Sequence, residues 1–175
     1  LLERYRYVHA ARKVVGVGSV GARAWIVLML GRDDNDPLFL QIKEAQASVL
    51  EPHTEASWYP HHGERVVQGQ KLTQAASDIF LGWMTAEGFD GEDRDYYVRQ
   101  LWDWKGSAEI EQMGPGRLAI YGRVVGTALA RAHARAGDRI AIASYLGGGA
   151  KFDEAITEFA EAYADQNQRD FEALR

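Results

Sequence analysis

The stretch Gly16-Val17-Gly18-Ser19-Val20-Gly21 decides the fold, because its meaning depends on the elements at its two ends. It matches the pattern Gly-x-Gly-x-x-Gly, which occurs in dinucleotide-binding folds, in protein kinases and in ordinary glycine turns. Residues 13–17 form a short run that favours a β-strand, and residues 24–30, Ala-Trp-Ile-Val-Leu-Met-Leu, form a second one. The sequence therefore predicts a glycine turn between two strands.

A third strand is expected soon after the second. Residues 31–37, Gly-Arg-Asp-Asp-Asn-Asp-Pro, are dense in turn formers, and residues 38–43, Leu-Phe-Leu-Gln-Ile-Lys, again favour a strand. From residue 13 to residue 43 we expect three consecutive antiparallel strands joined by tight turns.

This order of elements favours a kinase-like phosphate loop. In a dinucleotide-binding unit the third glycine opens a helix, whereas here a strand is expected after Gly21. In a kinase-like lobe the glycine loop joins two antiparallel strands and covers the phosphates, and a lysine on the third strand pairs with them. Lys43 lies 22 residues after Gly21, at the end of the expected third strand. The alternatives are a plain glycine turn and an edge lysine that discourages sheet aggregation.

The candidate nucleotide-binding residues are therefore Gly16, Gly18, Ser19, Gly21, Lys43 and an acidic partner of Lys43. A helix is expected over residues 62–77, with Glu64 in its first turn and Gln68 one turn later as an uncharged alternative. Glu64 either orients Lys43 or complements the helix dipole, which is worth about 0.3–1 kcal/mol. The pattern leaves both roles open.

The rest of the chain predicts two more strands and then helices. Residues 79–84 and 96–104 favour strands, and residues 87–93 between them have the composition of an exposed hairpin loop. After residues 114–116, Gly-Pro-Gly, the apolar spacing becomes helical, and residues 152–174 outline a final amphipathic helix. We expect an α+β, protein-kinase-like fold: an antiparallel five-strand sheet with one helix, followed by a helical half. Residues 1–107 would be the N-lobe-like sheet with the glycine-rich loop, and residues 108–175 the helical part of the same domain.

Composition limits the class of protein. Among 175 residues, 46% are hydrophobic and 26% are charged, as in ordinary soluble domains. The absence of cysteine excludes disulfides, thiolate zinc sites and a cysteine nucleophile, and it fits a cytoplasmic protein. The longest apolar run, from Trp25 to Leu30, is far shorter than the roughly 20 residues of a membrane helix. A net charge of −5 argues against a general nucleic-acid binder. We expect neither a membrane nor a nucleic-acid partner.

The histidines do not predict a metal site. His53, His61 and His62 lie near Glu64, but they lack the i, i+4 spacing of helical zinc ligands. We interpret them as solvated loop histidines.

Two further polar motifs have simpler readings. His133 and Asp138 superficially resemble a kinase catalytic loop, but Ala143 stands where such a loop needs its metal-binding asparagine. A helix end capped by Gly137 explains the segment better. Residues 165–167, Asp-Gln-Asn, are either a polar helix face or part of a cleft lining, and their role stays open.

Four runs carry a resemblance to a known family: residues 12–21 (Arg-Lys-Val-Val-Gly-Val-Gly-Ser-Val-Gly), 37–45 (Pro-Leu-Phe-Leu-Gln-Ile-Lys-Glu-Ala), 74–78 (Gln-Ala-Ala-Ser-Asp) and 163–167 (Tyr-Ala-Asp-Gln-Asn). Across the whole chain the sequence resembles a bacterial domain-of-unknown-function family. The resemblance implies a kinase-like fold of permuted order, in which this chain looks like the C-terminal half. It also implies an upstream Gly-Asp-x-His-x-x-Asn-Phe-Gly segment and an Asn-Asp-Phe-Asp motif, which look like a catalytic loop and a metal-binding aspartate motif.

Neither upstream motif occurs in these 175 residues, so no catalytic residue is assigned here. Magnesium would be bound only if the upstream segment supplied its ligands. The expected function is the ATP-binding half of a kinase-like phosphotransferase-family protein with an unknown phosphate acceptor, inactive by itself. The alternative is a non-catalytic binding or scaffolding module, in which Trp25, Trp102 and Trp104 serve packing or partner contact. A third reading, a dinucleotide-dependent oxidoreductase, requires a helix directly after Gly21.

Overall fold

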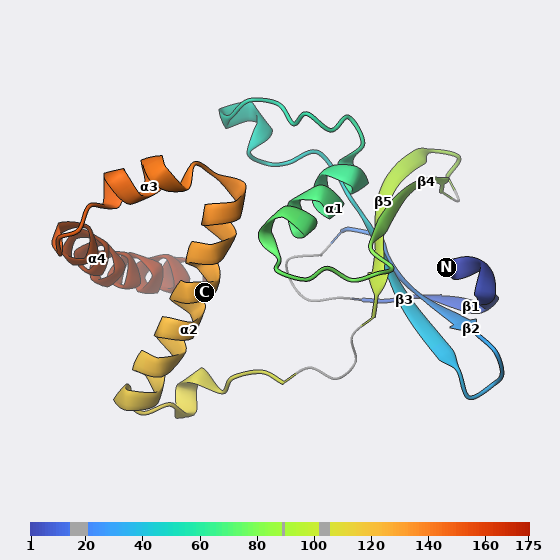
Figure 1. The fold of residues 1–175 in the computed structure, drawn as a ribbon, viewed down its shortest axis with the longest axis horizontal. Coiled ribbons are helices and arrows are strands. Elements are labelled where there is room, and N and C mark those ends of the chain that lie inside the picture. Colours follow the sequence, from blue (N-terminus) through green and yellow to red (C-terminus); the bar gives the residue numbers. More distant parts are fainter. Residues whose placement is uncertain (15–20, 89, 102–105) are drawn as a thin grey trace. The chain divides into compact units, whose positions relative to one another are not determined.

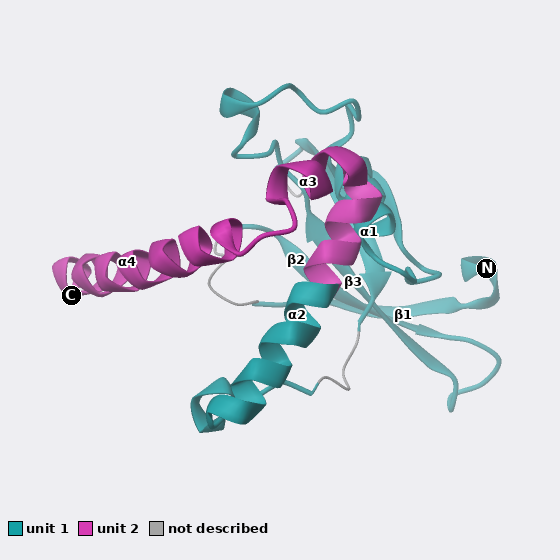
Figure 2. Cartoon of the chain, turned by 60° about the vertical axis from the view of Figure 1, so that its left-hand side comes forward, with its two compact units in different colours: residues 1–127 teal, residues 128–175 magenta. Residues whose placement is uncertain are grey.

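A computed structural model describes residues 1–14, 21–88, 90–101 and 106–175 of the chain (Figure 1). The strands are β1 (Arg6–Arg12), β2 (Ala24–Leu30), β3 (Pro37–Glu44), β4 (Gly82–Glu87) and β5 (Asp93–Gln100). The α-helices are α1 (His62–Thr73), α2 (Pro115–Ala136), α3 (Arg139–Leu146) and α4 (Lys151–Leu174), and short 3₁₀ turns occupy Leu2–Arg4, Glu51–His53 and Ile110–Gln112. The chain divides into two compact units, Leu1–Thr127 and Ala128–Arg175 (Figure 2).

The strands form one antiparallel five-stranded sheet in the order β1-β2-β3-β5-β4. This confirms the α+β class and the five-strand sheet. The second strand has the predicted bounds, and the third extends the predicted one by a residue at each end. Both strands are continuous apolar or β-prone runs between turn signals, which is why β2 and β3 could be predicted.

The position predicted for the first strand is wrong. The strand lies at Arg6–Arg12, and the described part of the predicted segment, Lys13 and Val14, follows its end. Residues 15–17 lie outside the described ranges. Strand β1 is an edge strand whose residues are mostly exposed, so its sequence, Arg-Tyr-Val-His-Ala-Ala-Arg, needs no apolar alternation. The Lys13 N–H still donates to the Ala24 carbonyl at 2.8 Å, which continues the pairing by one residue.

The fourth and fifth strands are both displaced by about three residues from the predicted segments 79–84 and 96–104. Asp78 causes the first displacement, since its carboxylate accepts from the Phe80 N–H and its carbonyl accepts from the Leu81 N–H. Both bonds close a turn where the sequence suggests a strand. The fifth strand starts earlier, at Asp93, and residues 102–105 lie outside the described ranges.

Helix α1 packs on β4 and β5. The His61 ring caps its start. The helix ends at Thr73, four residues before the predicted end at residue 77, and Gln74 after it is extended. Val67 on this helix is fully buried. The buried apolar residues of the described chain all belong to the sheet unit: Ala24, Leu38, Leu40, Ala45, Val67, Leu81 and Tyr96.

The helical character predicted after residue 114 is confirmed. Helix α2 begins at Pro115, a favoured first helical residue because proline has no N–H to leave unpaired. It ends before Gly137, whose N–H donates to the His133 carbonyl at 2.9 Å. Asp138 then caps α3, which the sequence reading did not separate, by accepting from the Ile140 and Ala141 N–H groups.

Candidate functional site

The described part of the glycine-rich segment is Gly21, which lies three residues before β2. Its φ of +85° belongs to the left-handed region that glycine adopts without steric cost. No helix occurs in the described stretch from Gly21 to the end of β2, since a strand begins at Ala24. The dinucleotide-binding reading is therefore wrong. Gly16, Gly18 and Ser19 lie outside the described residues.

Lys43 lies at the end of the sheet where the glycine-rich segment joins β2. In the β2–β3 ladder Lys43 is the partner of Ala24, the first residue of β2. Across β3 and β5 it is the partner of Tyr97. The sheet register therefore brings the predicted lysine close in space to the residues that follow the glycine-rich segment, although 22 residues separate it from Gly21.

Helix α1 begins on the face of the sheet that carries Lys43. The His62 N–H donates to Asp95 Oδ2 at 2.8 Å, and His61 Nε2 lies 3.1 Å from both Asp95 Oδ1 and Thr85 Oγ1. Asp95 and Thr85 are partners in the β4–β5 ladder and share a face. Because successive strand residues alternate between faces, Tyr97 lies on that face too, and so does its partner Lys43.

Glu64 lies in the first turn of α1, half-buried, and its N–H donates to His61 Nδ1 at 3.1 Å. Its helix thus starts on the face of Lys43, as an orienting carboxylate requires. The pairing of the Lys43 and Glu64 side chains stays a prediction. Burial raises the pKa of Tyr97, the cross-strand partner of Lys43, while the charge of Arg99 opposes that shift.

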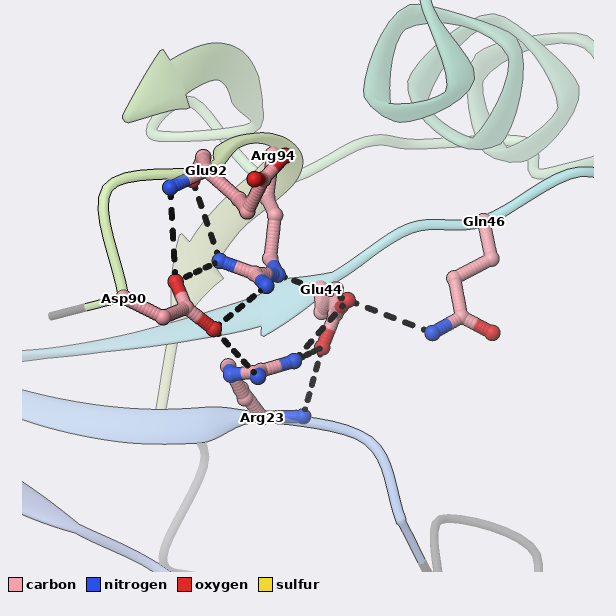
Figure 3. A network of polar contacts seen from close by, with 6 residues as sticks. All are labelled: Arg23, Glu44, Gln46, Asp90, Glu92 and Arg94. Carbon is pink, nitrogen blue, oxygen red and sulfur yellow. Dashed lines mark hydrogen bonds and ion pairs between the residues drawn. The ribbon is translucent and has the colours of Figure 1, made fainter. Parts of the chain in front are cut away.

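A network of charged side chains surrounds Glu44 (Figure 3). Glu44 follows Lys43 on β3, so its side chain lies on the opposite face of the sheet. Glu44, with only 5% of its side chain exposed, accepts from the Arg23 N–H at 3.0 Å and from the Arg23 guanidinium at 3.2 Å. Arg23 also reaches Asp90 at 3.3 Å. Arg94 pairs with Asp90 at 2.6 Å and lies 3.7 Å from Glu44. Two arginines and two carboxylates thus tie the β4–β5 hairpin loop to the ends of β2 and β3.

The network keeps both carboxylates ionised. Burial raises the pKa of Glu44, but the hydrogen bonds from Gln46 and Arg23 outweigh burial together, so the pKa lies below its usual 4.5. The hydrogen bond from Arg94 lowers the pKa of Asp90 to about 2. The same contact raises the pKa of Arg94.

A pocket of about 540 Å³ opens beside this network. Its lining comes from the ends of β1 and β2, from β3 and from the β4–β5 hairpin: Arg12, Arg23, Trp25, Ile42, Met84, Ala86, Glu87, Gly88 and Tyr96. Ile42 and Trp25 line it, whereas their sequence neighbours Lys43 and Ala24 do not, because strand neighbours point to opposite faces. The pocket and Lys43 therefore lie on different faces of one sheet.

Sequence reasoning missed this network and pocket. Arg23 and Glu44 are 21 residues apart and Arg23 and Asp90 are 67 apart, so only the sheet register joins them. The composition of residues 87–93 predicted only an exposed loop. The signal that could have indicated the network is the cluster of carboxylates in this loop directly before Arg94.

The structure also places the histidines at the start of α1 and the polar residues 165–167 of α4. The prediction of solvated loop histidines is wrong for His61 and His62. The His61 ring is 21% exposed and caps α1, and His62 is the first residue of α1, with its Nδ1 buried. Because His61 Nδ1 accepts from the Glu64 N–H, Nε2 carries the proton of the neutral ring and donates toward Asp95 or Thr85. On α4, Gln166 donates to Asp170 and accepts from Arg169, as in a polar helix face.

In residues 1–14, 21–88, 90–101 and 106–175, no group of three or more histidine, aspartate or glutamate side chains is arranged to hold a metal ion. Likewise, none of the helices in this part of the chain has the length and apolar character to cross a bilayer.

Comparison with known proteins identifies one family. A family model described as "Uncharacterized protein conserved in bacteria (DUF2252)" matches residues 1–175, the whole chain. No curated protein and no solved structure matches the chain.

Proposed function

The chain belongs to this bacterial family, and we propose that it is the ATP-binding part of a kinase-like phosphotransferase-family protein. One observation carries the proposal: Lys43 on the third strand stands beside the first residue of β2, next to the glycine-rich segment, on the face where α1 begins. A glycine loop between the first two strands, a lysine on the third strand and a helix after it are the parts with which kinases hold nucleotide phosphates.

Each residue has a proposed role toward ATP. The backbone N–H groups of residues 16–21 cover the phosphates, and Gly21, which has no Cβ, lets the backbone approach a ligand closely. The Lys43 ammonium pairs with the phosphates, and the Glu64 carboxylate orients that ammonium. The proposal assigns neither a magnesium ligand nor a catalytic base to these 175 residues, so the phosphate acceptor stays unspecified.

The test is calorimetric titration of ATP, ADP and AMP into the 175-residue chain. Since the proposed contacts are to phosphates, affinity should rise from AMP to ADP to ATP, and inorganic triphosphate should compete with ATP. No measurable binding of any nucleotide by the folded chain would contradict the proposal. That result would favour the alternative, a non-catalytic binding or scaffolding module.

A further inference from the structure

We propose that the pocket on the sheet face opposite Lys43 binds a small aromatic monoanion. This site is separate from the proposed ATP site and does not depend on it. Its volume of about 540 Å³ falls in the range of about 300–1,000 Å³ that is usual for small-molecule pockets.

The body of the pocket is apolar and aromatic. Trp25 on β2 and Tyr96 on β5 supply rings, and Ile42, Met84 and Ala86 supply aliphatic surface. Tyr96 is buried, with 6% of its surface exposed, so its position is held by packing. Flat aromatic side chains and apolar walls favour a planar, apolar ligand body, because aromatic pairs gain from stacked or edge-on contact.

Two arginines at the strand ends supply positive charge. Arg23 already donates to Glu44 and reaches Asp90, so its guanidinium is held in place and its charge is balanced. The Arg12 backbone pairs with Trp25 in the β1–β2 ladder, whereas the Arg12 guanidinium has no hydrogen-bond or ion-pair partner among the described residues. A guanidinium presents paired donors that match a carboxylate, sulfonate or phosphate, so Arg12 is the group that would bind the ligand anion.

The charge balance limits the ligand to a single negative charge. Glu44 and Asp90 balance Arg23 and Arg94 in the adjoining network, and Glu87 lines the pocket as an exposed carboxylate. A second negative group on the ligand would find no further unpaired guanidinium in the described lining and would be repelled by the Glu87 carboxylate. A monoanion is therefore favoured over a dianion of the same shape.

The probe is 8-anilinonaphthalene-1-sulfonate, an aromatic monoanion, and its Kd for the folded chain is measured by fluorescence and calorimetry. Arg12→Gln should raise this Kd at least fivefold, and Ala86→Trp, which fills the pocket, should abolish binding to this site. The matched control is Arg6→Gln, on the same strand but outside the pocket lining, which should leave the Kd unchanged. Thermal melts verify that each variant is folded.

The neutral analogue N-phenyl-1-naphthylamine has a similar shape without the sulfonate, so it tests how much of the binding depends on the negative charge. Its Kd should not change in Arg12→Gln, and Glu87→Gln should narrow the preference for the monoanion over naphthalene disulfonates. If Arg12→Gln raised the Kd of the neutral probe as much as the Kd of the anionic probe, the proposed role of Arg12 would be overturned. Wild-type affinity in a folded Ala86→Trp variant would overturn the site itself. If the Lys43→Met variant no longer bound 8-anilinonaphthalene-1-sulfonate, the two faces of the sheet would not hold separate sites.

Discussion

Lys43 stands opposite Ala24 in the β2–β3 ladder, and Ala24 follows Gly21 by three residues. The ladder thus places the lysine at the end of the sheet where the glycine-rich segment joins β2. A lysine nearer the start of β3 would be farther from that segment by about 3.3 Å for each residue of displacement. This relationship is the structural basis of the proposed phosphate site.

Glu44 should make the stability of the sheet unit depend on pH. Its pKa is lowered in the folded state, so its contribution to the free energy of unfolding is complete above the unfolded pKa of about 4.5. The contribution is lost as the pH falls through the lower folded pKa. Glu44→Gln, which weakens hydrogen bonds to charged groups, should lower the free energy of unfolding at pH 7 by about 1.5–3 kcal/mol.

Urea unfolding at pH 7 and pH 3 measures this effect. The difference in the free energy of unfolding between wild type and Glu44→Gln should be smaller at pH 3 than at pH 7, because pH 3 lies below the unfolded pKa of about 4.5. Glu55→Gln, at an exposed loop position, is the control and should track the wild type at both pH values. A constant difference between wild type and Glu44→Gln would show that the charge of Glu44 is not what stabilises the network.

Replacing Gly63 or Gly69 of α1 by alanine should have opposite effects on the stability of the fold. A Cβ on Gly63 would lie 2.3 Å from the Tyr96 carbonyl oxygen, a backbone atom that cannot turn away, whereas a Cβ on Gly69 meets nothing within 4 Å. Gly63→Ala should therefore destabilise the fold by about 1–3 kcal/mol or more, as overpacking does. Gly69→Ala should stabilise it by about 0.5–1 kcal/mol, because alanine favours the helix. Chemical denaturation of both variants is the measurement, and equal effects would mean that α1 does not lie against β5 as described.

The isolated 175-residue chain should show no phosphotransfer. Among its sequence motifs there is no Asp-x-x-x-x-Asn catalytic loop that could orient an acceptor and hold magnesium, since Ala143 follows Asp138 at the position where an asparagine is required. The measurement is phosphate release from labelled ATP in the presence of magnesium, with heat-denatured chain as the background. Sustained ATP turnover by the purified chain would show that its catalytic groups have been misassigned.

The parts of the fold that the sequence predicted well are those with a strong local pattern. Strand β2 is a continuous apolar run between turn signals, and its predicted bounds are correct. Strand β1 was misplaced because an exposed edge strand carries no apolar alternation. The sequence analysis did not predict α3 as a separate helix. The signal was present, because Gly137 is a typical residue after a helix end and Asp138 is a typical N-cap of the next helix.

The two candidate sites also differ in how far they could be predicted from local sequence patterns. Lys43 and Gly21 were found because their motif and spacing are local in sequence. The pocket with Arg12 and the network of Arg23 with Glu44 depend on the register of strands that are distant in sequence. No local pattern reports such a register, since it follows from pairing across the sheet.

The measurement that tests the central claim most directly is calorimetric titration of ATP into wild type and Lys43→Met. Methionine keeps much of the aliphatic stem, so thermal melts should show a change in stability below about 1.5 kcal/mol. ATP affinity should fall tenfold or more, equivalent to about 1.4 kcal/mol of lost phosphate interaction. Lys151→Met, in the helical unit, is the matched control and should bind ATP like the wild type. Equal ATP affinities of wild type and a folded Lys43→Met variant would contradict the account and make Lys43 an ordinary sheet lysine.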